Sequence, residues 1–163
     1  MQEYGVNAWS LGVRTAARLR VCSLDNRRLG ELVEIEREIF LLPWGEREYT
    51  AFFLQQTSLA LGVLDRGRLV GFITCFNMPG ELEVLNLAVR EGYRRQRLGT
   101  SLLLRAVGVF RETSSGGSVF LEVRESNRPA IALYTKLGFA RSGVRENYYL
   151  DSGEDAWIMR LDL

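Results

Sequence analysis

The sequence predicts a mixed α/β domain in which helices flank a largely antiparallel sheet. Short runs in which apolar and polar residues alternate are typical of strands, and longer runs with apolar residues three and four positions apart are typical of helices. Along the 163 residues these runs follow the order β-α-α-β-β-β-α-β-α-β-β. We therefore expect one domain over residues 17–163, preceded by an N-terminal extension, residues 1–16.

Capping and turn residues mark where several of these elements begin and end. Asp25 can cap the first helix, and the Asp-Arg-Gly triplet at 65–67 is a hairpin signal. Asn127 and Pro129 suit the start of the last helix, and Gly138 suits its end. The expected elements are strand 19–24, helix 26–40, helix 46–56, strands 58–65, 68–77 and 80–89, helix 98–113, strand 118–123, a helix that follows Asn127, and strands 139–149 and 155–162.

The strand expected at 80–89 contains a break in its alternation. Its apolar residues occupy even positions at 82 and 84, and then odd positions at 85, 87 and 89. Such a phase change predicts a β-bulge at 84–86, and bulges often lie beside active sites. The alternative is a strand that is buried on both faces, where alternation need not hold.

Composition and charge restrict the classes of function. The net charge of +1 does not indicate binding to nucleic acid or to an anionic membrane. No apolar run is long enough to span a bilayer. Cys22 and Cys75 are interpreted as reduced core thiols of a cytoplasmic protein. The chain has no histidine, which argues against a metal site and excludes Ser-His and Cys-His hydrolases. Acid–base chemistry must then use a carboxylate, tyrosine, cysteine, lysine or the substrate itself.

The segment EGYRRQRLGTSLL, residues 91–103, places a cationic run directly before a helix. A helix N-terminus has unpaired N–H groups and a positive dipole end, which suit a phosphate or pyrophosphate. Nearby arginines would add charge-assisted contacts. The alternatives are a solvated surface loop or a small basic patch for nucleic acid.

A carboxylate and a phenol follow in LEVRESNRPAIALYTKLGF. Glu122 lies on a predicted strand, and Asn127 and Tyr134 are seven residues apart, so they share one face of the next helix. Glu122 and Tyr134 could therefore converge on one cleft. Alternatively, Glu122 is a solvated strand residue and Tyr134 a core aromatic.

Four motifs together make the chain resemble the GNAT acetyltransferase superfamily, and within it the ribosomal-protein alanine N-acetyltransferases. They are E-x-x-I-F-x-x-P-W around residues 37–44, NLAV before the cationic loop, LEVRxSNxxAxxLYxKLGF, and REN-Y-Y…EDAxxM near the C-terminus. The resemblance covers roughly residues 19–163. It implies the GNAT acyl-CoA N-acyltransferase fold, whose mostly antiparallel, splayed sheet holds acetyl-CoA between two central strands.

The resemblance also implies roles for individual residues. Glu122 would be the general base and Tyr134 the general acid of a direct acetyl transfer without a metal. The bulge at 84–86 would free strand amides for the thioester oxygen. The residues that would contact acetyl-CoA are Leu87, Ala88, Val89, Arg94, Arg95, Gln96, Arg97, Leu98, Gly99, Thr100, Asn127 and Tyr134.

On the substrate side, the resemblance implies a protein N-terminus, in particular the alanine of a small-subunit ribosomal protein. Trp44, Asn147, Tyr148 and Tyr149 would flank the peptide, although aromatics in a hairpin are more often cross-strand packing. We expect a monomer or weak dimer that binds neither nucleic acid nor membrane.

One position departs from the family pattern. The family has Q/R-x-x-G-x-G/A in its pyrophosphate loop, and this chain has Arg97 where the first glycine is expected. A Cβ there is unfavourable if the backbone needs positive φ, so we expect weakened or rearranged cofactor binding. Two alternatives therefore stay open: a small-molecule amine acetyltransferase, and an acyl-CoA-binding module with weak catalysis.

Overall fold

The computed structural model describes residues 19–163, and the extension predicted at 1–16 lies outside this range. Every predicted strand and helix is present and in the predicted order. The strands are β1 (Leu19–Ser23), β2 (Ser58–Asp65), β3 (Arg68–Met78), β4 (Glu81–Val89), β5 (Ser118–Arg124), β6 (Ala140–Tyr149) and β7 (Glu154–Asp162). The helices are α1 (Leu29–Ile39), α2 (Glu46–Phe53), α3 (Leu98–Thr113) and α4 (Arg128–Lys136), with 3-10 turns η1 (Asn26–Arg28) and η2 (Glu91–Tyr93).

The strands form one open, mostly antiparallel sheet in the order β1-β2-β3-β4-β5-β7-β6. Its β4–β5 pair is parallel, whereas β1–β2, β5–β7 and β6–β7 are antiparallel. The predicted mixed, largely antiparallel architecture is therefore confirmed.

The described chain divides into two compact units. Unit 1 contains residues 19–75 and 86–106, and unit 2 contains residues 76–85 and 107–163. The strands β3 and β4 and the helix α3 each run through both units. The single domain expected over 17–163 stays a prediction.

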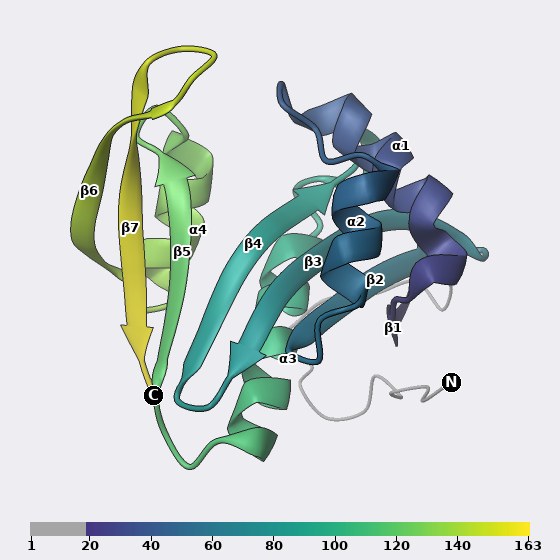
Figure 1. Cartoon of the computed structure of the whole chain (residues 1–163), viewed down its shortest axis with the longest axis horizontal. Helices are drawn as coiled ribbons and strands as arrows, with labels where there is room; N and C mark the ends of the chain where they lie inside the picture. Colours follow the sequence, from purple (N-terminus) through teal and green to yellow (C-terminus); the bar gives the residue numbers. More distant parts are fainter. Residues whose placement is uncertain (1–18) are drawn as a thin grey trace. The chain divides into compact units, whose positions relative to one another are not determined.

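In unit 1, α1 and α2 lie against strands β2 and β3 (Figure 1). The ring of Tyr49 on α2 packs edge-on against Phe72 on β3, with 6.2 Å between centroids. From α1, Glu31 accepts the backbone N–H of Leu69 at 2.7 Å. The predicted hairpin is also present, because Arg66 and Gly67 both have positive φ, as a two-residue type I′ turn requires. These contacts fix the helical layer on the strands that lead into β4.

In unit 2, α4 lies beside strands β5 and β7 (Figure 1). Asn127 caps α4 as predicted, since its Oδ1 accepts the N–H of Ala130 at 3.2 Å. At the other end Gly138 has φ +94°, and a Cβ there would lie 3.3 Å from the Leu161 side chain on β7. The predicted start and end of this helix are both confirmed, which fixes the position of Tyr134 relative to the sheet.

The start of the β4–β5 pair depends on a close approach of two glycines. The N–H of Ser118 donates to the carbonyl of Gly80 at 3.0 Å. A Cβ at Gly117, which has φ +147°, would lie 2.3 Å from that same carbonyl oxygen. Glycine at 117 therefore permits the pairing that places Glu83 opposite Phe120.

Gly117→Ala is expected to lower the free energy of unfolding by at least about 2 kcal/mol, because the new methyl group overlaps backbone and the φ is strained. Gly116→Ala is the matched control, since its Cβ would meet nothing nearer than the Leu163 carbonyl at 3.8 Å. Urea unfolding should show a change of about 0.5 kcal/mol or less for the control. Equal effects of the two substitutions would contradict this account.

Candidate active site

The strand predicted to contact the cofactor lies in unit 1. Ala88 is buried, and Leu87 and Val89 are half-buried. Leu87 points toward the start of α3, where a Cβ at Gly99 would lie 3.9 Å from its side chain. The neighbouring Asn86 points the other way, toward Tyr49 on α2. The end of β4 is thus held between α3 and α2, whereas the bulge at 84–86 stays a prediction.

The cationic loop has two residues in the left-handed region. Arg95 has φ +65° and Arg97 has φ +60°, so the positive φ at which a Cβ is unfavourable is present at position 97 and also at position 95, whereas weakened cofactor binding stays a prediction. The carbonyl of Arg97 accepts the N–H of Ser101 at 3.0 Å, which is the first turn of α3. The amides of Leu98, Gly99 and Thr100 therefore have no partner within the helix.

The side chains of this loop are directed to solvent. Arg94, Arg95, Gln96 and Arg97 are all exposed, while Leu98 is buried and anchors the helix start. Arg94 Nε donates to the carbonyl of Val89 at 3.1 Å, which links the loop to the strand before it. Exposed guanidinium groups beside helix amides that have no partner within the helix form a site that can bind an anion such as a phosphate.

In unit 2, the predicted base Glu122 sits in a small charged cluster. Its Oε1 lies 2.7 Å from Nε of Arg145, and its side chain is 25% exposed. The hydroxyl of Tyr148 hydrogen-bonds the same carboxylate, and this contact is the main cause that raises the pKa of Tyr148 to about 12. Burial and the nearby charge of Glu122 raise the pKa of Glu83. Glu122 is therefore accessible and has both a cation and a second carboxyl group beside it.

The predicted acid Tyr134 is buried on α4. Burial is the main cause that raises its pKa to about 12, and Tyr149 adds to this shift. Tyr149 is in turn within electrostatic range of Glu122, whose charge raises the pKa of Tyr149 together with the larger effect of burial. Tyr149 thus links the two predicted catalytic groups within unit 2.

Strand β6 carries an irregularity that shapes this cluster. Arg145 pairs with Ala156 and Tyr149 pairs with Glu154, so three residues of β6 stand opposite Asp155 alone. Asn147, the middle residue, has φ +50°, and its N–H donates to Oδ1 of Asp155 at 2.8 Å. Asn147 therefore acts here through its backbone conformation, and its expected contact with peptide stays a prediction.

Trp44 lies in unit 1 and packs against Tyr49, with 5.3 Å between ring centroids. Its backbone N–H donates to the fully buried Glu36 at 3.1 Å, and the hydroxyl of Tyr49 donates to the other oxygen of this carboxylate at 2.7 Å. Burial raises the pKa of Glu36 despite these two hydrogen bonds. Glu36 thus fixes the connection between α1 and α2 on which Trp44 is placed.

Four residues near the predicted site were missed in the sequence: Glu36, Glu83, Arg145 and Asp155. A carboxylate on the apolar face of helix 26–40 was a signal for Glu36. Arg145 and Asp155 stand in the quoted C-terminal motif, but nothing local indicated their contacts or those of Glu83, because these depend on how the strands pair.

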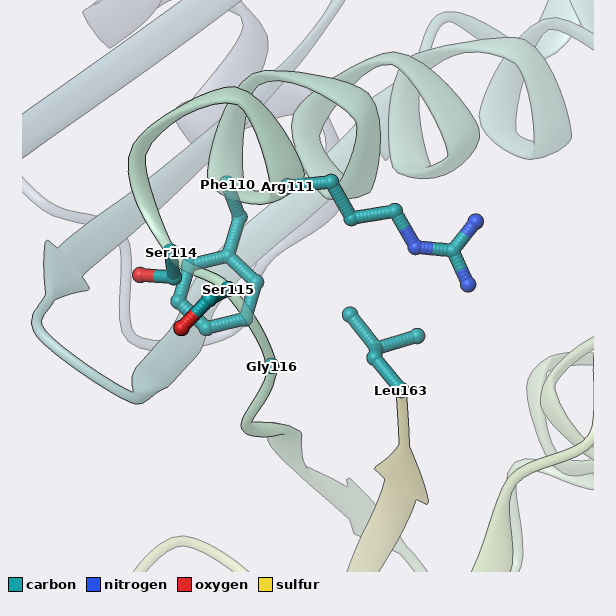
Figure 2. A pocket seen from close by; sticks show the side chains of 6 residues that line it. All are labelled: Phe110, Arg111, Ser114, Ser115, Gly116 and Leu163. Atoms are coloured by element: carbon teal, nitrogen blue, oxygen red, sulfur yellow. The ribbon is translucent and has the colours of Figure 1, made fainter.

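A cavity of about 410 Å³ lies elsewhere in unit 2. Figure 2 shows its lining residues, which come from the end of α3, the loop before β5 and the last residue of the chain. None of the predicted site residues lines it. Its surface is mostly apolar, and it offers no cluster of acid–base groups.

The matching family model covers residues 29–139, which include the cationic loop, Glu122 and Tyr134, and it describes the acetyltransferase (GNAT) family. The chain belongs to this family. It is therefore an acetyltransferase, as the four motifs indicated.

Relatives are similar over nearly the whole chain. The [Ribosomal protein bS18]-alanine N-acetyltransferase of Escherichia coli is 34% identical over 145 residues, which are 88% of this chain and 97% of that protein. The N-alpha-acetyltransferase RimI of Mycobacterium tuberculosis is 34% identical over 135 residues, 79% of this chain and 83% of that protein. The crystal structure of the E. coli enzyme has a TM-score of 0.82 at 32% identity, covering 88% and 93% of the two chains.

A more distant solved structure shares the fold and contains the expected cosubstrate. Arabidopsis thaliana NAA60 in complex with acetyl-CoA has a TM-score of 0.80 at 20% identity and covers 89% of this chain and 98% of that one. Two further facts concern the described part of this chain. No helix there is long and apolar enough to cross a membrane, and residues 19–163 hold no group of three or more potential metal ligands.

Two substitutions of Arg97 separate the energetic cost of its left-handed backbone conformation from the effects of its guanidinium group. In urea unfolding, the free energy of unfolding of Arg97→Gly should exceed that of Arg97→Ala by roughly 0.5–1 kcal/mol. Alanine bears the steric cost of the left-handed backbone, and this cost is partly offset because glycine loses more conformational entropy on folding. Because both variants lack the guanidinium, the difference isolates the Cβ. Calorimetry should also show tighter acetyl-CoA binding by Arg97→Gly, and identical affinities would mean that the departure from glycine is harmless.

Proposed function

We propose that this acetyltransferase transfers the acetyl group of acetyl-CoA to the N-terminal α-amine of a protein, namely the alanine of a small-subunit ribosomal protein. The observation that carries this proposal is the similarity, over 88% of the chain, to the E. coli enzyme named for alanine of ribosomal protein bS18. The accessible carboxylate and buried phenol in unit 2 support the same chemistry.

Acetyl-CoA supplies an acetyl thioester, and the protein's task is to hold it and to manage protons. The exposed arginines of the loop and the first amides of α3, those of Leu98, Gly99 and Thr100, would hold the pyrophosphate. Leu87, Ala88 and Val89 would contact the pantetheine arm through their strand edge, and Asn127 would contact it from the start of α4.

Glu122 would accept the proton that the amine loses as its nitrogen bonds to the acetyl carbon. An N-terminal α-amine has an ordinary pKa of about 7.7–8.0, so a substantial fraction is already neutral near neutral pH. A carboxylate that is one-quarter exposed can take up the remaining proton directly or through a water. A lysine side chain, with a pKa of about 10.4, would need stronger assistance.

Tyr134 would assist the sulfur as the C–S bond breaks. Its pKa of about 12 keeps the phenol protonated at neutral pH, so it can donate a hydrogen bond to the departing thiolate. Because thiols have an ordinary pKa of about 8.5, complete proton transfer from this phenol is unfavourable. We infer that Tyr134 acts mainly as a hydrogen-bond donor, and that solvent completes protonation of CoA.

Each unit by itself contains candidates for contacts with the peptide. Tyr148 and Tyr149 stand edge to face, with 5.2 Å between centroids, beside Glu122. Asn147 and Trp44 are the remaining candidates for contacts with the peptide. Much of the rate acceleration would then come from holding the amine nitrogen close to the thioester carbon in a reactive orientation.

Glu122→Gln and Tyr134→Phe should each lower kcat by roughly 100-fold or more, which is the scale of general acid–base assistance. Both substitutions keep shape and remove one proton function, so acetyl-CoA binding by calorimetry should persist. Glu125→Gln, which alters an exposed glutamate just after β5, is the matched control. Full activity in both variants would overturn the assigned roles.

The substrate class is tested with a panel of acceptors incubated with acetyl-CoA and analysed by mass spectrometry. Peptides beginning with alanine should gain one acetyl group at the terminus, whereas N-terminally blocked peptides with an internal lysine and a polyamine should not. Transfer to the polyamine alone would favour a small-molecule enzyme. Acetyl-CoA binding without transfer to any amine would favour a binding module with weak catalysis.

A further inference from the structure

Two carboxylates share one face of the parallel β4–β5 pair. Glu83 stands opposite Phe120, and Glu122 lies two residues further along β5, so both side chains project from the same face. Diagonal neighbours of this kind are about 7–8 Å apart, within reach of a shared ligand. Glu83 is half-buried, and Glu122 is one-quarter exposed. Two carboxylates in such a place repel each other, and a cation beside them stabilises their charged forms.

In the free protein this cation comes from β6. Arg145 Nε is 2.7 Å from Glu122 Oε1, and the charge of Arg145 also acts on Glu83. The side chain of Arg145 is 56% exposed, so it can leave the carboxylate without crossing packed atoms. The guanidinium also lies over the ring of Tyr148, 5.4 Å from its centroid.

The irregularity in β6 explains why two residues three apart meet at one carboxylate. In a regular strand Arg145 and Tyr148 would project from opposite faces. Here three residues oppose Asp155, and Asn147 takes a left-handed conformation that Asp155 holds through its carboxylate. The unfavourable backbone conformation of Asn147 allows both side chains to reach Glu122.

The surroundings of Glu122 hold more negative than positive charge once Arg145 is set aside. Its partner across β7 is Ile158, which has no charge. Tyr148 has its pKa raised to about 12 and stays neutral at neutral pH. The ionisable groups that act on this face are Glu83 and Glu81 from β4, and Arg145, Tyr148 and Tyr149 from β6. Two further arginines lie on it, but each is already paired with carboxylates of its own: Arg124 of β5 with Asp151 and Glu154, and Arg160 of β7 with Asp162.

From this geometry we propose that Glu122 and Glu83 form the site that receives the substrate's α-ammonium group, and that Arg145 occupies this site in the free protein as an internal counter-ion. The proposal rests on the proposed function, because it identifies the substrate cation with a protein N-terminus. The incoming ammonium group displaces the guanidinium, and Tyr148 keeps its hydrogen bond to Glu122. The amine is thereby brought to the carboxylate that accepts its proton. Glu83 thus becomes a specificity-determining residue.

The test is calorimetric binding of two peptides to the full chain in the presence of CoA, which cannot donate an acetyl group. One peptide begins with a free alanine and the other is the same peptide acetylated at its terminus. At about pH 6.5 the free α-amine is mostly protonated, because its pKa is about 7.7–8.0. Only the free peptide then carries the cation that must compete with Arg145.

Arg145→Gln should tighten binding of the free peptide by roughly three-fold, the scale of an ion pair with one exposed partner, and leave the acetylated peptide unchanged. Glu83→Gln should weaken the free peptide alone. Arg141→Gln is the matched control, because Arg141 is also an exposed arginine of β6 but stacks on Trp157, 4.6 Å from its ring centroid. This control should change neither affinity.

Three outcomes would overturn the proposal: equal changes for both peptides, a loss of free-peptide affinity in Arg145→Gln, or no difference between Arg145→Gln and Arg141→Gln. Circular dichroism of each variant excludes unfolding as the cause. If the unaltered protein acetylates alanine peptides and one of these outcomes is found, the inference alone fails. If the unaltered protein neither binds nor acetylates any N-terminal peptide, the proposed function fails with it.

Discussion

The parallel pairing of β4 with β5 is the constraint on which the candidate catalytic face of unit 2 depends. It begins where the N–H of Ser118 meets the carbonyl of Gly80, at a spacing that only glycine at 117 permits. From that point the register is fixed residue by residue, and Glu83 comes to lie opposite Phe120. A shift of one residue in this pairing would turn Glu83 to the other face and remove it from Glu122. A steric condition at one loop therefore determines where the chemistry can occur.

A second constraint comes from β6, the strand at the end of the sheet. An end strand can tolerate irregular pairing, because one of its edges makes no ladder. The left-handed Asn147 uses this freedom, and the carboxylate of Asp155 satisfies its N–H. On β5, Arg124 pairs with Asp151 and stacks on Tyr149, 3.8 Å from the ring centroid. These contacts hold the tyrosines beside Glu122 while the side chain of Arg145 stays half exposed.

In unit 1, buried polar groups hold the segments that the family resemblance assigns to ligands. Glu36 uses both carboxylate oxygens to hold Tyr49 and the backbone of Trp44, and Asn86 on β4 lies beside Tyr49. A buried carboxylate is costly unless its hydrogen bonds are satisfied, and the two donors here meet that need. The loop before α3 carries strain instead, at Arg95 and Arg97. The α1–α2 connection is thus held by buried hydrogen bonds, whereas the exposed loop before α3 keeps an unfavourable backbone.

The sequence by itself determined the order of the elements, the cap at Asn127, the hairpin at 65–67 and the unfavourable backbone at Arg97, because each depends on residues close in the chain. It also indicated Glu122 and Tyr134 through their motif, and their catalytic roles stay predictions. Only the tertiary structure decided that Glu83, Arg145 and Tyr148 surround Glu122, and that Glu36 holds Trp44. The tyrosines were expected to flank the peptide, with cross-strand packing as the alternative; the structure places Tyr148 on the Glu122 carboxylate and Tyr149 under the guanidinium of Arg124, and their contact with peptide stays a prediction. The physical reason is that strand register and a left-handed residue in β6 are set by pairing between distant segments, which no local pattern records.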